Sequence, residues 1–206
     1  MNVAALMIAL RRKMGVDPDD GLLTPDVLVD LLDEANKELE AERDWPWRET
    51  SATITTVAGT ASYAMPSNWL RTTSIREANE EPMVERTTMD LDYRNPSGVT
   101  GQPIEFAVYG STLTLSPTPD SVRTLTHRYI RDVPQLRWDA DEPLMPAMFH
   151  AAIVSAAAAV AYERQGADQR AQSAQLTVDR WRGRMIDDQR RTRGPLRVRV
   201  RPGSAI

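Results

Sequence analysis

Histidines and clustered acids are the residues of this chain whose types could carry out catalysis or bind a metal. His127 and His150 are its two imidazoles, and they lie 23 residues apart without the HExxH spacing of a zinc-binding helix. Asp139, Asp141 and Glu142 cluster just before a proline, but general acid–base catalysis also requires a pocket and a shifted pKa. A loop that favours the N-terminus of the next helix is the simpler interpretation of these acids.

An aspartate-rich turn superficially matches a calcium-binding loop. It consists of Asp17, Asp19, Asp20 and Gly21. An EF-hand loop requires glycine at its sixth position and glutamate at its twelfth, whereas here glycine stands fifth and Leu28 stands twelfth. The chain also lacks the GxSxG, GxxxxGK and GxGxxG patterns of nucleophilic and phosphate-binding loops. We therefore predict no catalytic residue, no cofactor or cofactor-binding residue and no metal ligand, and a protein that is not an enzyme.

Charge is unevenly distributed along the chain. The 206 residues carry a net charge of −4, but residues 180–201 contain nine arginines and two aspartates, a balance of +7. Residues 1–179 hold the remaining 16 basic and 27 acidic side chains, a balance of −11. An acidic body with a basic C-terminal arm indicates that the arm binds a partner, either nucleic acid or an acidic protein surface.

Composition and hydropathy exclude further classes. The chain contains no cysteine, which rules out disulfides, thiolate nucleophiles and cysteine-bound metals. Residues 143–162 are uncharged, but alanine dominates them and two prolines interrupt them, so a helix packed on other helices is expected instead of a membrane span. The N-terminus lacks the order of charges of a secretory signal. No membrane partner is predicted.

Two helices are predicted in the first 46 residues. Residues 2–14 form a short amphipathic helix that breaks near Gly15. The second helix begins with Thr24 as its N-cap and Pro25 at its first position, and it ends at Pro46. Its apolar residues form a stripe at helical spacing: Leu28, Leu31, Leu32, Ala35 and Leu39. The opposite side is expected to be solvated: Asp33, Glu34, Lys37, Glu38, Glu40 and Glu42.

Short β-branched segments in the middle of the chain predict antiparallel strands. Strands are expected at residues 50–57, 62–65, 70–76 and 122–130. Gly110-Ser111 is a two-residue hairpin turn that places Phe106 opposite Leu115. The apolar side chains of this hairpin then share one face: Ile104, Phe106, Val108, Leu113 and Leu115. A sheet with one apolar face requires a cover, which we expect the helices to supply.

Two more helices are predicted near the C-terminus, one from Pro146 to Gly166 and one from Asp168 to Gly194. The complete pattern predicts an α+β fold, in which N-terminal and C-terminal helices form a bundle with a small antiparallel β-domain inserted between them. The expected segments are N-terminal helices 1–48, β-domain 49–135, C-terminal helices 136–193 and an extended basic arm 194–206.

The arm alternates strictly between apolar residues and arginines: Leu196, Arg197, Val198, Arg199, Val200 and Arg201. Three interpretations remain open, namely a solvated tail, a contact with DNA phosphates and a strand that adds to the sheet edge of another chain. Alternation over six residues favours the added strand, because a random tail does not alternate. We therefore treat these six residues as a predicted partner interface.

Three tryptophans could also meet a partner. Trp45, Trp47 and Trp69 are expected first in the core, because large aromatic side chains contribute most to burial. An interface is the alternative, since tryptophan is enriched at interfaces and their energetic hot spots.

Several short segments occur in an informative order. Asp33-Glu34-Ala35-Asn36 and Glu38-Leu39 are followed by Trp45-Pro46-Trp47, by TVAGTASYAMP at 56–66, and by a meander from Gly101-Gln102-Pro103 to Pro119-Asp120. Together they resemble the NEA…EL, TVAGQxxYxLP and GxPxxYxxxGxxLxLxPxPD segments of the head-to-tail adaptor (connector) family of tailed bacteriophages. The resemblance covers residues 20–165, with Asp33 in place of Asn, Met65 in place of Leu and Phe106 in place of Tyr.

The resemblance implies a structural protein of the virion. It implies a ring of about twelve copies beneath the portal vertex, which joins the capsid to the tail and surrounds the DNA channel. The implied partners are the portal protein, a tail or nozzle protein, other copies of the chain and the DNA in the channel. The implied location is the virion neck, with the host cytoplasm during assembly. The alternative is a DNA-binding protein that uses the basic arm, with an affinity that falls steeply with salt.

Overall fold

The structure is a computed structural model that describes residues 1–15, 23–94 and 98–193. Contacts divide the chain into two compact units. The helical unit combines Met1–Pro46 with the segment that begins at Pro134, and the β unit is Trp47–Val133. Helices and sheets are both present, so the predicted α+β class is confirmed. The arm at 194–206 and the aspartate-rich turn lie outside the described residues.

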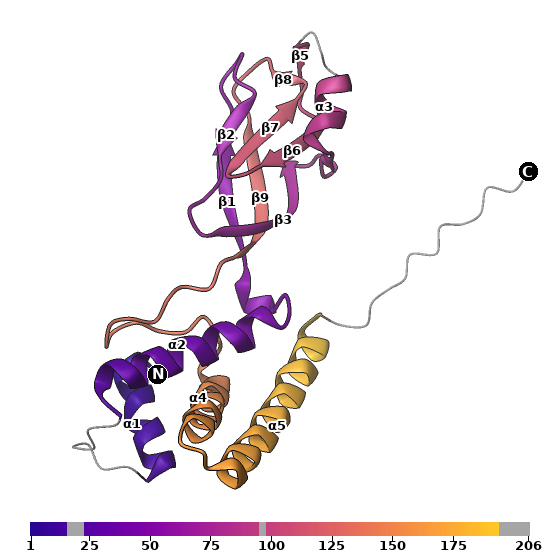
Figure 1. Cartoon of the computed structure of the whole chain (residues 1–206). Coiled ribbons are helices and arrows are strands. Elements are labelled where there is room, and N and C mark those ends of the chain that lie inside the picture. The colour runs from indigo at the N-terminus through magenta and orange to yellow at the C-terminus, as the bar shows by residue number, and fades with distance from the viewer. Residues whose placement is uncertain (16–22, 95–97, 194–206) are drawn as a thin grey trace, which may run out of the picture. The chain divides into compact units, whose positions relative to one another are not determined.

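Four helices build the helical unit (Figure 1): α1 Val3–Met14, α2 Pro25–Ala41, α4 His150–Arg164 and α5 Asp168–Arg193. A 3₁₀ turn, η2 Ala147–Phe149, precedes α4. Asn2 caps α1 by accepting the amide of Ala5 at 3.1 Å. Gly15 ends this helix in the left-handed region, with φ +68°. The predicted start of α2 is confirmed, because Thr24 is its N-cap and Pro25 its first residue.

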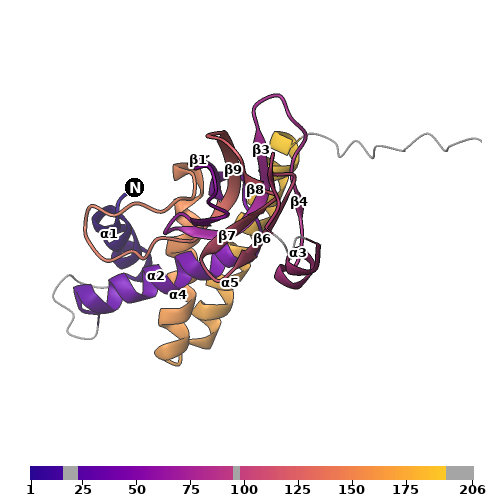
Figure 2. The ribbon, with the colours of Figure 1, turned by 90° about the horizontal axis from the view of Figure 1, so that it is seen from above.

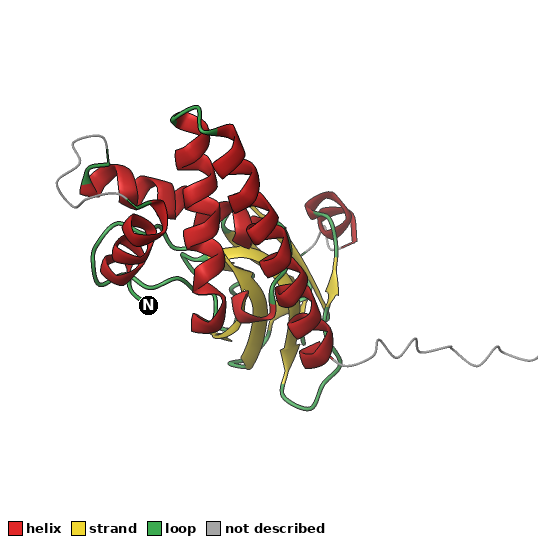
Figure 3. Ribbon diagram, turned by 90° about the horizontal axis from the view of Figure 1, so that it is seen from below, coloured by secondary structure: helices red, strands yellow, loops and turns green. Residues whose placement is uncertain are grey.

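Helix α4 lies at the centre of the helical unit. Eleven of its fifteen residues are buried, and most of these are alanine. Helices α1, α2 and α5 all pack on α4, and α5 also meets the end of α2, where Arg182 contacts Glu42 (Figure 3). A helix that is apolar all round must be buried, and alanines let the neighbouring backbones approach closely. None of the helices in the described part of the chain combines the length and the hydropathy needed to cross a membrane.

The β unit contains two main sheets. A three-stranded antiparallel sheet has the order β1-β9-β3, formed by β1 Glu49–Thr55, β9 Thr124–Arg131 and β3 Trp69–Glu77. The four-stranded sheet has the order β2-β7-β6-β4, formed by β2 Ser62–Ala64, β7 Thr112–Ser116, β6 Glu105–Tyr109 and β4 Val84–Glu85. A 3₁₀ turn, η1 Pro46–Arg48, directly precedes β1.

Most strand pairs of the β unit are antiparallel, in line with the predicted antiparallel β-domain, but two parallel pairs also occur. Strand β4 runs parallel to β6, and β5 Thr100–Gly101 runs parallel to β8 Thr118–Pro119. The short helix α3, Thr88–Arg94, connects β4 to β5 in the chain and lies beside β6 and β4 (Figure 2). The connection that contains α3 lets the later strand β6 run alongside β4 in the same direction, which a tight hairpin cannot do.

The core of the β unit lies between its own strands. Its buried side chains come from both sheets and from Met65, which directly follows β2: Ile54, Met65, Ile75, Phe106, Leu113, Leu115 and Leu125. The hairpin register is confirmed, since Phe106 stands opposite Leu115, and Gly110 has the positive φ, +58°, that the turn requires. Every member of this cluster belongs to the β unit, and the expectation that the helices cover the strands stays a prediction. Ile104 precedes β6 and is 61% exposed, so it does not join the expected face.

Candidate interaction surfaces

Asp33 ties helix α2 to the segment that leads into η2 and α4. Its Oδ1 accepts the amide of Leu136 at 2.8 Å, and its Oδ2 accepts from Lys37 Nζ at 2.6 Å. Leu136 itself is buried. The expected solvated side of this helix is therefore partly covered, because the segment around Leu136 lies against it. Asp33 and Glu40 are both buried, and for these two acids the prediction of exposure is wrong.

The acids before Pro146 serve a different helix from the one expected. The backbone carbonyls of Asp139 and Asp141 accept the first two amides of α1, at 3.2 and 2.9 Å. The Asp141 carboxylate accepts the amides of Trp138 and Arg137, both at 2.8 Å, and these two bonds lower the pKa of Asp141. The acidic turn therefore satisfies the N-terminal amides of α1, which have no partner inside their own helix.

The two histidines lie in different units and have separate structural contacts. His127 is hydrogen-bonded through Nε2 to the Thr72 hydroxyl at 3.0 Å and stacks on Tyr129, with 4.9 Å between ring centroids. His150 donates from Nε2 to the carbonyl of Met145 at 2.8 Å. Burial lowers the pKa of both imidazoles. Among the residues that the structure describes, no group of three or more His, Cys, Asp or Glu side chains is placed to hold a metal.

The predicted tryptophans occupy different environments. Trp45 is fully buried and donates from Nε1 to the carbonyl of Leu39 at 2.8 Å. Trp69 packs against the β core, and Trp47 is half-buried. Trp138 is 72% exposed, and sequence reasoning missed it because nothing in its neighbourhood distinguishes an exposed tryptophan from a core one. A role of Trp47 and Trp69 in an interface stays a prediction.

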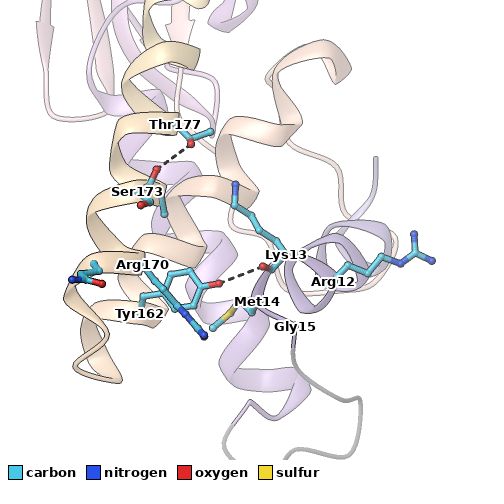
Figure 4. Close-up of a pocket in the computed structure, with 10 residues that line it drawn as sticks. Arg12, Lys13, Met14, Gly15, Tyr162, Arg170, Ser173 and Thr177 are labelled. Carbon is cyan, nitrogen blue, oxygen red and sulfur yellow. Dashed lines mark hydrogen bonds between the residues drawn. The ribbon is translucent and has the colours of Figure 1, made fainter.

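A hollow of about 740 Å³ opens between α1, α4 and α5 (Figure 4). Lys13 donates to Ser155 Oγ at 2.7 Å, and burial lowers the pKa of Lys13. The Tyr162 hydroxyl donates to the carbonyl of Lys13 at 3.3 Å, while Arg12 points away from the hollow. None of the side chains that the structure places around the hollow is acidic. The hollow is thus a positively charged recess without a paired acid and base.

Four exposed arginines follow one side of α5, and we call them the arginine flank: Arg170, Arg180, Arg184 and Arg191. At 3.6 residues per turn they fall within about 80° of arc and span about 30 Å of helix. Arg184 lies over the ring of Trp181, 4.7 Å from its centroid. Asp188 shares the same arc. Within the described ranges, none of the four arginines forms an ion pair, and the flank continues the positive charge of the hollow.

Acids recur at every fourth position of α2 and the residue that follows it, and we call them the acidic stripe: Asp26, Asp30, Glu34, Glu38 and Glu42. The second half of the stripe is paired inside the helical unit. Glu34 meets Arg164 at 2.8 Å, and Glu42 meets Arg182 at 2.6 Å. Arg182 also approaches Glu38 at 3.8 Å. Asp26 and Asp30 have no ion pair in the part of the chain that the structure describes.

The hollow, the arginine flank and the acidic stripe are charged surfaces suited to binding other molecules. Comparison with family models identifies the class directly. The model of the SU10 adaptor protein family matches residues 1–199, and the chain belongs to that family. The resemblance to bacteriophage head-to-tail adaptors is thereby confirmed, and the chain is a structural adaptor of the phage type. A search of curated proteins finds no match.

Proposed function

We propose that this protein is a head-to-tail adaptor that forms a ring between the portal vertex and the tail, around the DNA channel. The family match over residues 1–199 carries the proposal. The charged surfaces support it, because an adaptor works through contacts with other copies and with its neighbours in the neck. About twelve copies in a closed ring would repeat each contact, and repetition raises the overall affinity without new contacts.

The negative body of the protein suits a wall beside DNA. Residues 1–179 carry a balance of −11, and a net negative charge repels the phosphate backbone. Repulsion lets DNA pass along such a wall without binding to it. The proposal therefore places DNA in the channel as a passing neighbour and not as a ligand.

The arm supplies the proposed link to the portal protein or to the next adaptor. Its six alternating residues, 196–201, suit a strand that adds to a partner's sheet edge, with valines and leucine on one face and arginines on the other. Such an arm binds weakly as a single copy, and the ring makes the sum of the contacts strong.

Two matched variants test whether assembly depends on the apolar residues of the arm or on its arginines. Val198→Asn with Val200→Asn keeps all three arginines of the arm but removes two of the three residues of its apolar face, leaving Leu196. Arg197→Gln with Arg199→Gln keeps the alternation and reduces the charge. We expect the asparagine variant to lose assembly on a portal ring, measured by native mass, as a chain lacking 195–206 does. Full assembly of the chain without 195–206 would contradict the role of the arm.

DNA binding by the basic arm is the second candidate, and the three arginines of the arm, together with six more between residues 180 and 193, favour it. It predicts binding to duplex DNA that weakens steeply between low and physiological salt. It also predicts that the glutamine variant loses binding while the asparagine variant retains it. This is the opposite of the pattern expected for a strand that docks on a protein.

A further inference from the structure

We propose that the arginine flank of α5 in one copy binds the acidic stripe of α2 in the next copy. The contact centres on Arg180 and Arg184 of the first chain and on Asp26 and Asp30 of the second. This inference rests on the proposed function, since it names the surfaces through which copies of the adaptor join.

Unpaired acids at the start of α2 are the first observation. The later acids of the stripe contact arginines of their own chain, but Asp26 and Asp30 do not within the described residues. Asp26 lies in the first turn, where the helix dipole favours an acid. Asp30 lies a turn further along, where that effect has faded, and it stands four residues from both Asp26 and Glu34. Like charges at this spacing repel. No ion pair within the described residues compensates the charge of Asp30.

Unpaired arginines in the middle of α5 are the second observation. Arg180 and Arg184 stand four residues apart, and both are exposed. Neither lies in the last turn of a helix that extends to Arg193, so the helix dipole does not explain them. The neighbouring Leu176 is 58% exposed, one turn before Arg180.

A protein partner fits this surface better than DNA does. An exposed leucine beside the arginines gains from an apolar contact, which a phosphate backbone does not offer. The body of the chain, with its balance of −11, repels DNA but offers acidic partners to the flank. Asp26 and Asp30 are four residues apart, and so are Arg180 and Arg184, a spacing of about 6 Å along each helix. Two helices can therefore match both charges at once, and a second copy supplies the required helix.

The two surfaces differ, so the contact is heterologous. The acidic stripe belongs to α2 and the arginine flank to α5, two separate helices that both pack on α4 (Figures 1 and 3). A contact between two different faces of the same chain leaves one free face at each end, and it repeats from copy to copy. Such repetition closes into a ring when the rotation between copies allows it.

Charge reversal tests the proposal on the full chain with its cognate portal ring. One variant carries Asp26→Arg and Asp30→Arg, and the other carries Arg180→Glu and Arg184→Glu. Each variant alone places like charges on both surfaces and should lose the full complement of copies per portal, measured by native mass. An equimolar mixture should restore it, because each variant then meets only the other. A chain with all four changes should also assemble.

Controls separate misfolding from lost contact. Glu163→Arg reverses an exposed acid on α4 that lies outside both surfaces and should leave assembly unchanged. Asp26→Asn with Asp30→Asn removes the charges without placing a cation at a helix N-terminus, and it should weaken assembly if the acids contact a neighbour. Circular dichroism of every variant should match that of the unmodified chain.

The outcomes distinguish this inference from the proposed function. If the unmodified chain assembles on the portal and both reversals assemble equally well, the α2–α5 contact is wrong while the adaptor function stands. If the reversed arginines abolish binding to duplex DNA, the reversed aspartates have no effect and the mixture does not restore assembly, the flank binds nucleic acid. If the unmodified chain does not join a portal, the proposed function fails and the inference fails with it.

Discussion

Asp33 contributes to stability at the residue scale, because its carboxylate is the acceptor for a buried amide. We expect Asp33→Ala to leave the amide of Leu136 without its partner. Loss of a buried hydrogen-bond acceptor should lower the free energy of unfolding by about 1–3 kcal/mol, measured by urea denaturation.

Glu34→Ala is the matched control for this change. Glu34 and Arg164 form an exposed pair, with about half of each side chain in solvent, and such pairs contribute less than about 1 kcal/mol. Equal destabilisation by the two alanine substitutions would contradict the structural role of Asp33.

His127 makes stability depend on pH. Burial lowers its pKa below the ordinary value, so the folded chain binds a proton less readily than the unfolded chain. Stability should therefore be complete above about pH 7 and decline as the pH falls through about 6.5, by at most about 1.4 kcal/mol per pH unit for one histidine. Unfolding in urea between pH 7.5 and 5.5 measures this slope.

His127→Gln tests the assignment of the slope. Glutamine retains a hydrogen-bonding group toward Thr72 but does not titrate. The variant should show a shallower decline of stability with falling pH, with the remainder due to His150, whose pKa is also lowered. A decline parallel to that of the unmodified chain would show that His127 does not contribute.

Helix α5 offers a test at the scale of the element. Gly183 lies within this helix, and a Cβ added there would meet nothing within 4 Å. Gly183→Ala should raise the free energy of unfolding by about 1 kcal/mol, because alanine loses less backbone entropy in a helix. Gly166 precedes the same helix with φ +69°, and Gly166→Ala should destabilise by about 1–2 kcal/mol. Effects of the same sign in urea denaturation would contradict these backbone assignments.

Elements governed by local chemistry could be predicted from the sequence. The start of α2 follows from Thr24 and Pro25, and the hairpin register follows from Gly110-Ser111, because capping and turn preferences act over a few residues. The burial of Asp33 could not be predicted, since its partner Leu136 is 103 residues away in the chain. The packing of the two sheets also depends on strands that are distant in the chain. Alternation of apolar and polar residues shows which face of a strand is apolar, but it does not show which element packs against that face.

For the charged surfaces, the sequence shows where the charges are but not which of them form ion pairs. Arginines near the end of the chain and the acids of α2 are visible in the sequence. Their pairing is not, because Arg182 meets Glu42 across 140 residues while Arg180 and Arg184 remain unpaired in the described chain. The structure was needed to separate arginines used inside the chain from those left on the surface.

At the scale of the whole molecule, the family and the charged surfaces support the proposal that the chain is one unit of an assembly. It belongs to the SU10 adaptor protein family, and its two compact units have separate cores. Charged side chains lie along helices α2 and α5, as the acidic stripe and the arginine flank. In the proposed ring, those charges would join neighbouring copies of the chain. The arm would bind the portal protein or the next adaptor.

The most direct test of the adaptor function is the native mass of the full chain mixed with its cognate portal ring at physiological salt. The proposal predicts a stable complex that carries many copies of the chain on each portal ring. A chain that remains separate from the portal, and instead binds duplex DNA with an affinity that falls steeply with salt, would contradict it.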